Sequence, residues 1–300
     1  MPPAPNDRPT LRYALDEAQK VLAEGAHPEH ARRDTETLLV HALRMNAPDA
    51  NLAWLIAHDN APKMPNVGPE FRALVQRRLA GEPIQYITGE AEFYGLPFHA
   101  NRDVLIPRPE TEHLVEKAIA LAQRLRLTWA PSPRIVDVGT GSGAIAVALA
   151  HALPFAAITA TDISAAALAV AKANAARNGF ADRIRFFEGD LLGPVVGELF
   201  DIVVSNPPYV PESDRNTLDV EVRDYEPAQA LFAGEDGLAI YRRLIPAAFG
   251  ALVPGGFVAL EIGYGQQEAI HALLAGAGFS GIEFTEDLQK ILRVAVARRS

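Results

Sequence analysis

The sequence lacks cysteine altogether. This absence excludes disulfide scaffolds, thiolate metal sites, iron–sulfur clusters and cysteine nucleophiles together. It also fits a reducing compartment, so we expect a cytoplasmic protein. The eight histidines show no spacing typical of metal ligands, and we therefore expect no metal site.

Excess positive charge is also missing. The 300 residues carry 28 Lys and Arg against 37 Asp and Glu, which gives a net charge of −9. Both parts of the chain are acidic, with −3 in residues 1–104 and −6 in residues 105–300. Broad binding of phosphates needs clustered positive charge, so we expect no direct nucleic-acid partner.

No segment is typical of a signal peptide or a membrane span. Residues 1–9 contain four prolines and no apolar run, which predicts a disordered tail. The longest stretch without a charged residue, from Val138 to Thr161, is long enough to cross a bilayer. However, it opens on three glycines and contains His151 and Pro154, which indicate a turn, a helix and a strand instead.

The pattern of apolar residues divides the chain after this tail. Residues 10–89 show only helical periodicity and predict a small all-α N-terminal domain, a packing or substrate-docking module. Residues 90–104 combine aromatics with glycine and proline, which predicts a β-hairpin connector. In residues 105–300 strands and helices alternate, and this predicts an α/β domain with a mostly parallel, seven-stranded Rossmann-like sheet.

Ligands of such sheets bind beyond the carboxyl ends of the strands, where the strand order reverses. The expected strands are Arg134–Val138, Ala157–Thr161, Ile184–Glu188, Asp201–Ser205 and Gly256–Glu261, with further β-like sequence near Gly281–Phe284 and Leu292–Val296. Candidate functional residues follow four of them.

A glycine-rich turn follows the first strand and precedes an apolar helix. Its residues are Gly139, Thr140, Gly141, Ser142 and Gly143. Glycines allow a sharp turn and a close approach to a ligand, and the start of the helix offers free N–H groups with partial positive charge. We predict that these five residues bind a cofactor. A tight strand–helix turn without a ligand would use glycine in the same way.

The next two strands end in acids. Asp162 stands 21 residues after Gly141, where a carboxylate can accept both hydroxyls of a ribose. Asp162 can also cap the helix that starts near Ser164. Asp190 and Leu191 follow the third strand and are placed to flank an adenine. The three strand ends together predict an adenosine-containing cofactor.

The spacing of the glycines favours S-adenosylmethionine. The third glycine comes one residue earlier than in the dinucleotide fingerprint, and no Walker lysine motif is present. S-adenosylmethionine has no pyrophosphate to bind, which suits this shorter loop. A dehydrogenase or a nucleotidase is the alternative.

The fourth strand runs into Asn206-Pro207-Pro208-Tyr209. Two prolines end the strand and stiffen the loop. The Asn206 side-chain oxygen and the Pro207 carbonyl can accept the two hydrogens of a planar NH₂ group, and Tyr209 can stack on that group. We predict that these four residues bind substrate, that Asn206, Pro207 and Tyr209 act in catalysis, and that Asn206 also touches the cofactor. The alternative is a proline-rich strand exit with a core tyrosine.

This motif resembles the signature of amino-methyltransferases, which is shared by N6-adenine or N4-cytosine DNA methyltransferases and protein-glutamine N5-methyltransferases. Other segments resemble the release-factor glutamine methyltransferases over nearly the whole chain. These segments are Leu105–Glu112, Tyr86–Gly89, Glu92–Phe98, Tyr225–Pro227 and Ala230–Leu231.

The resemblance implies methyl transfer from S-adenosylmethionine to the glutamine of the Gly-Gly-Gln motif in class I peptide chain release factors. It implies that residues 139–143 form the cofactor loop, that Asp162 holds the ribose and that residues 206–209 clamp the substrate amide. Leu191 takes the adenine-flanking position, where the family often has an aromatic residue. We expect a monomer with a protein substrate and no membrane partner.

Three alternatives stay open at this point. They are a glutamine methyltransferase for a ribosomal protein, an N6-adenine DNA methyltransferase, and a binding protein that senses the cofactor without turnover. Arg108, Glu110 and Glu112 either face the pocket or form caps and ion pairs. Residues 212–226 hold six acids and two bases, which predicts a mobile, solvated loop that can also receive a protein substrate.

Overall fold

The computed structural model describes residues 10–45, 47–61 and 67–300, so the predicted tail lies outside the described residues. The chain divides into two compact units. Unit 1 comprises Met1–Gly89 and Asp219–Tyr225, and unit 2 comprises Glu90–Leu218 and Glu226–Ser300.

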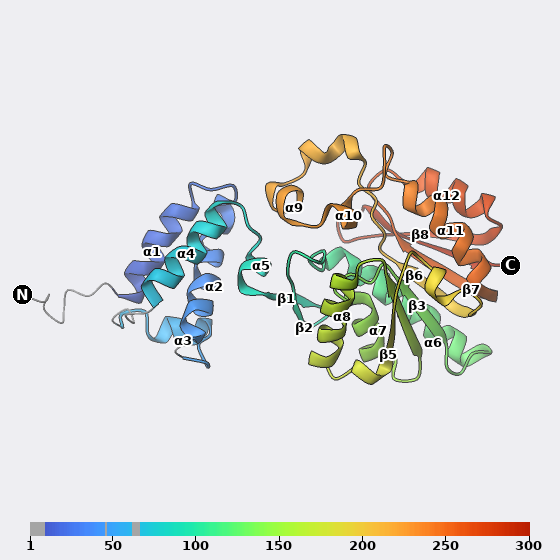
Figure 1. Cartoon of the computed structure of the whole chain (residues 1–300), viewed down its shortest axis with the longest axis horizontal. Coiled ribbons are helices and arrows are strands. Elements are labelled where there is room, and N and C mark those ends of the chain that lie inside the picture. Colours follow the sequence, from blue (N-terminus) through green and yellow to red (C-terminus); the bar gives the residue numbers. More distant parts are fainter. Residues whose placement is uncertain (1–9, 46, 62–66) are drawn as a thin grey trace, which may run out of the picture. The chain divides into compact units, whose positions relative to one another are not determined.

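Unit 1 is helical, and α1, α2 and α4 pack around its core (Figure 1). Its elements are α1 (Leu11–Leu22), η2 (Pro28–His30), α2 (Ala31–Arg44), α3 (Leu52–Ala57), α4 (Val67–Leu79), α5 (Ile84–Thr88) and, from later in the chain, α9 (Val220–Tyr225). Thr10 caps α1 by accepting a hydrogen bond from the Tyr13 N–H at 3.2 Å, as its residue type favours. Buried leucines such as Leu38, Leu39 and Leu43 fill the core.

The segment 219–225 belongs to unit 1 although it follows the predicted catalytic loop in sequence. Gly81 makes room for it, because a Cβ there would lie 2.8 Å from Cγ1 of Val220. The Tyr225 hydroxyl donates to the Ala80 carbonyl at 2.9 Å. The structure thus differs from the expected single domain over 105–300. It also differs from the expected loop over 212–226, which contains η6 (Glu212–Thr217) and α9.

Unit 2 begins with a two-stranded hairpin, β1 (Glu90–Phe93) and β2 (Leu96–His99). Its two-residue turn places Tyr94 and Gly95 at φ 53° and 70°, the pair of positive φ angles that matches the twist of a tight hairpin. Buried Asn174 anchors the hairpin, since it accepts from the His99 N–H at 2.6 Å and donates to the Ser142 carbonyl at 2.9 Å.

The rest of unit 2 is a seven-stranded sheet with strand order β5-β4-β3-β6-β7-β9-β8. The strands are β3 (Arg134–Val138), β4 (Ala157–Asp162), β5 (Ile184–Glu188), β6 (Phe200–Ser205), β7 (Leu252–Glu261), β8 (Phe279–Glu286) and β9 (Leu292–Arg299). The first five run parallel, and β9 pairs antiparallel with β7 and β8. The predicted fold class is confirmed.

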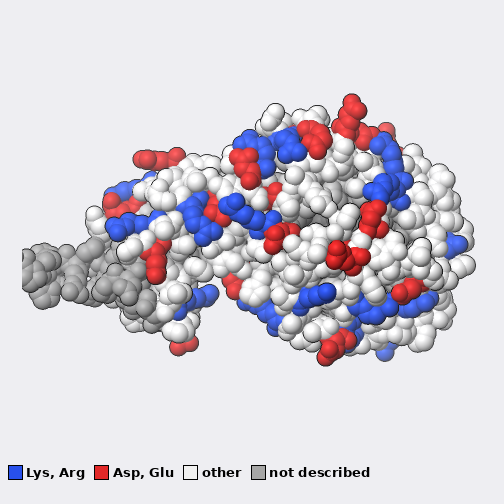
Figure 2. Space-filling model, viewed as in Figure 1, with Lys and Arg blue, Asp and Glu red and all other residues white. Residues whose placement is uncertain are grey.

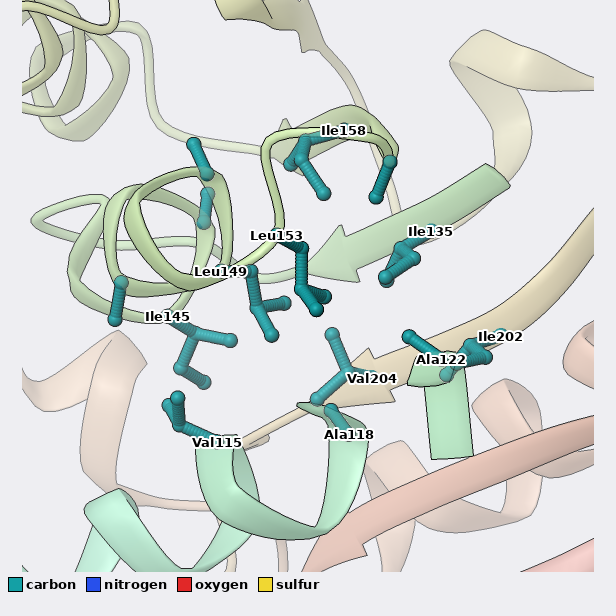
Figure 3. Close-up of a cluster of buried hydrophobic side chains, with 14 of the residues drawn as sticks. Val115, Ala118, Ala122, Ile135, Ile145, Leu149, Leu153, Ile158, Ile202 and Val204 are labelled. Atoms are coloured by element: carbon teal, nitrogen blue, oxygen red, sulfur yellow. The ribbon is translucent and has the colours of Figure 1, made fainter. Parts of the chain in front are cut away.

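Helices cover both faces of this sheet (Figure 1). The longer helices are α6 (Glu112–Thr128), α7 (Ala144–Ala152), α8 (Ala165–Arg177), α11 (Ala239–Ala251) and α12 (Gln267–Gly276). Shorter ones are η3 (Pro109–Thr111), η4 (Ala181–Arg183), η5 (Gly193–Val195) and α10 (Ala228–Leu231). Neighbouring residues of one strand face opposite layers. Ile135 therefore lies in the cluster formed with α6 and α7 (Figure 3), and Val136 lies in the cluster formed with α11 and α12.

Among the described residues, no helix combines the length and the apolar character that a membrane crossing needs. Figure 2 shows basic and acidic side chains interspersed over the face in view, rather than separated by sign.

Candidate active site

The site lies at the switch point of the unit 2 sheet. Strands β3 and β6 are neighbours although they are the first and fourth strands of that sheet in sequence. The glycine turn after β3 and the Asn-Pro-Pro-Tyr motif after β6 therefore leave the same edge side by side. Ser205 ties the two strand ends together by donating its hydroxyl to the Val138 carbonyl at 2.6 Å.

The three glycines of the turn have left-handed backbone conformations, with φ 73° at Gly139, 54° at Gly141 and 82° at Gly143. A Cβ on Gly139 or Gly141 would meet nothing within 4 Å, which leaves the backbone open to a ligand. A Cβ on Gly143 would lie 3.1 Å from Cα of Ala171. The third glycine therefore serves the close packing of α7 on α8.

Asp162 joins the turn to the end of β4. One of its oxygens accepts from the Gly141 N–H at 2.8 Å, and the other accepts from the Ser164 N–H at 2.9 Å. The cap of α8 is Ser164 itself, whose hydroxyl accepts from the Ala167 N–H at 3.1 Å. Each carboxylate oxygen can accept one more hydrogen bond, so Asp162 keeps capacity for two ribose hydroxyls.

These strand ends surround a cavity of about 260 Å³ within unit 2. The predicted site residues that line it are Gly139, Thr140, Gly141, Ser142, Asp162, Asp190, Leu191, Asn206 and Pro208. Gly143, Pro207 and Tyr209 are not part of the lining. Lining residues that the sequence analysis did not assign include Phe93, Val104, Thr111, Gln229 and Arg243.

The residues after β5 have two notable features. Leu191 adopts φ 50°, a left-handed conformation that is strained for a branched side chain, and such strain concentrates at functional sites. Asp190 forms an ion pair with Arg243 of α11, and both residues line the cavity. No feature of the sequence indicated Arg243, because its partner is 53 positions away.

Buried polar residues hold the Asn-Pro-Pro-Tyr motif from behind, among them Thr111 and Glu261. The Asn206 amide nitrogen donates to Oγ1 of Thr111 at 3.1 Å. The Tyr209 hydroxyl donates to Oε1 of Glu261 at 3.4 Å, and Gln266 donates to the Tyr209 carbonyl at 3.0 Å. These contacts fix both ends of the motif. Thr111 stands in the segment that resembles the release-factor enzymes, so the sequence did carry a signal for it.

Two buried carboxyl groups flank the site and have raised pKa values. Burial raises the pKa of Glu261 to about 7, against the opposing effects of the Thr111 hydroxyl and the Arg293 charge. Burial also raises the pKa of Asp137 to about 7, and the charge of Asp162 adds to this while the Thr140 hydroxyl opposes it. Burial, and then the charge of Glu261, raises the pKa of Tyr209.

The residues at the start of α6 have structural partners. Arg108 lines the cavity and pairs with buried Glu226 at 2.6 Å. Glu112 accepts a hydrogen bond from the Tyr94 N–H at 2.8 Å and so holds the hairpin turn. Arg108 thus both faces the pocket and forms an ion pair, whereas Glu110 and Glu112 are not part of the lining.

Within the described part of the chain, groups of ligand-type side chains occur around His27 in unit 1. His27 lies close to Asp219 and Glu221, a combination that linear spacing does not reveal. The guanidinium of Arg78 lies 2.5 Å from Glu221 and supplies positive charge there, which disfavours a metal cation.

Two family models match the chain. One is described as the PrmC N-terminal domain and matches residues 13–89, and the other is described as the methyltransferase small domain and matches residues 116–223. Among solved structures, the hMettl16 catalytic domain superimposes with a TM-score of 0.56 at 18% identity, over 78% of this chain and 81% of that chain. A methyltransferase from Pyrococcus furiosus gives 0.50 at 19% identity, over 77% and 98%.

At these identities the structures show the fold alone, and with the family models they define an S-adenosylmethionine-dependent methyltransferase. Curated relatives are more specific. Those from Geobacter sulfurreducens, Moorella thermoacetica and Bordetella pertussis are 41%, 44% and 42% identical, over 96%, 90% and 90% of this chain and 96%, 91% and 96% of theirs. Each is named release factor glutamine methyltransferase. The chain belongs to the release factor glutamine methyltransferase family, which confirms the resemblance.

Proposed function

We propose that this protein transfers a methyl group from S-adenosylmethionine to the side-chain amide nitrogen of the glutamine in the Gly-Gly-Gln motif of class I peptide chain release factors. One observation carries this proposal. The Asn206 amide nitrogen is taken by Thr111, which leaves the side-chain oxygen of Asn206 as an acceptor at the cavity. An acceptor in this place suits a substrate that presents an NH₂ group.

The cavity lining fits the cofactor. Gly139 and Gly141 offer open backbone, and Asp162 has acceptor capacity for a ribose. Asp190, Leu191 and Arg243 line the same cavity, and we expect the first two to flank the adenine. When bound, S-adenosylmethionine supplies an electrophilic methyl group attached to a positively charged sulfur.

The residues of the motif can compensate for the low nucleophilicity of the substrate amide. An amide nitrogen is a poor nucleophile because its lone pair is delocalised into the carbonyl. In the proposed clamp the Asn206 oxygen, at the cavity, and the carbonyl of Pro207, which is outside the lining but next to Asn206 in the chain, accept the two hydrogens. This returns electron density to nitrogen and stabilises the positive charge that develops there. The clamp also aims the nitrogen, which removes an orientational cost. Tyr209, with its hydroxyl at Glu261, supports the loop from behind.

The reaction needs no strong base. The glutamine nitrogen gains the methyl carbon through its lone pair, and the bond between that carbon and sulfur breaks with its electrons left on sulfur. The methylated nitrogen then carries a positive charge and is very acidic, so its proton passes to water.

The test is to incubate the protein with a class I release factor and methyl-labelled S-adenosylmethionine and to map the label by mass spectrometry. The expected result is one methyl on the Gly-Gly-Gln glutamine, and none on a release factor in which that glutamine is alanine. Ribosomal proteins and adenine-containing DNA serve as competing substrates. Label on either of these, with none on the release factor, would overturn the proposal.

Asn206→Ala tests the clamp in the same assay. The expected loss of kcat is about 100- to 1,000-fold, because an acceptor that matters in the transition state is removed. Affinity for S-adenosylmethionine should be largely kept. Asn60→Ala, which removes an exposed asparagine of unit 1, is the control and should keep wild-type turnover. Near-normal turnover of Asn206→Ala would contradict the clamp.

A further inference from the structure

The hydrogen bond that orients Asn206 ends on Thr111, a buried residue whose hydroxyl acts on a buried carboxyl group. Thr111 Oγ1 accepts from the Asn206 amide nitrogen, and Thr111 is itself 5% exposed. The Thr111 hydroxyl also interacts with the carboxyl group of Glu261 at the end of β7, which is 2% exposed. Tyr209, three residues after Asn206, reaches the same carboxyl group.

The direction of these hydrogen bonds follows from the chemistry of the groups. An ionised carboxylate only accepts, and Oε2 of Glu261 is buried without a hydrogen-bond partner among the described residues, so we assign the single hydrogen of Thr111 to this carboxylate. Its oxygen is then free to accept, and this places the nitrogen of the Asn206 amide against Thr111 and the oxygen toward the cavity. A protonated Glu261 can donate to Thr111 instead. Thr111 would then donate to Asn206, whose amide would turn over and present NH₂ to the substrate.

Charged and polar groups on the elements that pack against Glu261 influence its carboxyl group and its position. Arg293 of β9 supplies positive charge and is itself paired with Asp287 at 3.1 Å. Glu110 of η3 supplies negative charge. The Tyr241 hydroxyl of α11 donates to the Glu261 backbone carbonyl at 2.6 Å and so fixes the end of β7. Burial outweighs the positive charge, and this places the titration of Glu261 near neutral pH.

We propose that Thr111 and Glu261 are positioning residues that hold the Asn206 side-chain oxygen toward the substrate amide, and that protonation of Glu261 releases this orientation. The inference rests on the proposed function, because it assumes that Asn206 accepts from an NH₂ group of the substrate.

The kinetic test compares Thr111→Val with Thr111→Ser. Valine keeps the shape of threonine without the hydroxyl, so kcat should fall about 100-fold through misorientation of Asn206, while KM for release factor and the affinity for S-adenosylmethionine change little. Serine keeps the hydroxyl and should restore most of kcat. Wild-type kcat in Thr111→Val, or equal losses in both variants, would overturn the proposal.

The pH test uses Glu261→Gln. In the wild type kcat should rise with pH as Glu261 loses its proton at about pH 7. Glutamine keeps an acceptor oxygen for Thr111 and Tyr209 and does not titrate. The decrease of kcat below about pH 7, the acidic limb of the profile, should therefore be absent in the variant. The same acidic limb in both proteins would contradict the role of Glu261.

A third measurement needs no substrate. The side-chain amide of Asn206 is observed by NMR in protein labelled with ¹⁵N-asparagine and assigned by its loss in Asn206→Ala. Its signals should move with pH in the wild type and stay fixed in Glu261→Gln and Thr111→Val. A pH-independent signal in the wild type overturns this inference alone. The expected NMR response without methylation of release factor overturns the proposed function alone.

Discussion

One side-chain oxygen of Asp162 accepts a hydrogen bond from the backbone N–H of Gly141 at 2.8 Å. The contact joins the end of β4 to the glycine turn after β3. The acid proposed to hold the ribose thus also shapes the loop that approaches the cofactor. Its second oxygen holds the Ser164 N–H at the start of α8.

We expect Asp162→Ala to weaken binding of S-adenosylmethionine about 10- to 100-fold, because hydrogen bonds to a charged group are lost, each worth about 1.5–3 kcal/mol. Isothermal titration calorimetry measures the dissociation constant. Asp182→Ala removes an exposed acid of η4 and should leave it unchanged. Equal affinities in the two variants would show that Asp162 does not hold the cofactor.

Much of the sheet could be predicted because its signals are local. The central strands contain short apolar runs, as in residues 202–204, and glycine, proline or an acid stands at or near the ends where the chain must turn. The order of the strands then brings Gly139 and Asn206 to one edge, and the structure places both in the cavity lining.

Contacts between distant segments could not be predicted in this way. Asn174 is a helix residue in sequence, and only the fold reveals that it anchors the hairpin 75 positions away. The association of residues 219–225 with unit 1 depends on the absence of a side chain at Gly81. The link from Asn206 to Thr111 spans 95 positions, so no periodicity connects the two residues.

Alanine substitutions at Gly143 and Gly139 can separate the packing role of the glycine turn from its binding role. Both have positive φ, so alanine at either position should cost about 1–2 kcal/mol in left-handed strain. At Gly143 the added methyl group also meets Ala171, and overpacking should cost about 1–3 kcal/mol more. Thermal unfolding should therefore show a lower Tm for Gly143→Ala than for Gly139→Ala.

Cofactor binding should rank the same two variants in the opposite order. Gly139 lines the cavity and Gly143 does not, so Gly139→Ala should weaken S-adenosylmethionine binding more strongly. Calorimetric titration of the two folded variants measures this. If Gly143→Ala were the more stable variant, or the weaker binder, the division between a packing glycine and a binding glycine would be wrong.

Asp137 should make the stability of unit 2 depend on pH. Burial raises its pKa from 3.8 to about 7, so between these values the folded protein holds a proton that the unfolded chain has released. The folded state binds more protons there, and this contribution to stability is lost as pH rises toward and through about 7. Asp137→Asn removes the titration and keeps an oxygen for the Thr140 hydroxyl.

The free energy of unfolding of Asp137→Asn, relative to wild type, should therefore rise by about 1–3 kcal/mol from about pH 5 to pH 8. Urea unfolding at each pH measures the difference. Asp182→Asn, whose side chain is solvent-exposed in the folded protein, is the control and should show no such trend. A constant difference for Asp137→Asn would mean that Asp137 is already ionised at low pH.

Arg78 holds unit 1 together through buried charge. Its side chain is 5% exposed and lies 2.7 Å from Asp34, which is 2% exposed, and it also pairs with Glu221 of the segment 219–225. Arg78→Ala should destabilise unit 1 by about 3–5 kcal/mol, because buried Asp34 would keep only its longer contact with exposed Arg33 at 3.8 Å. Amide hydrogen exchange over residues 219–225 should rise at the same time, since Glu221 loses its anchor.

Two further variants separate this explanation from a general loss of packing. Lys20→Ala breaks an exposed pair with Glu17 and should leave the stability nearly unchanged, with no change in exchange over 219–225. The double variant Arg78→Met with Asp34→Leu removes both buried charges and should regain most of the stability that Arg78→Ala loses. If Arg78→Ala were as mild as Lys20→Ala, or if the double variant were less stable than Arg78→Ala, the buried pair would not be what stabilises this unit.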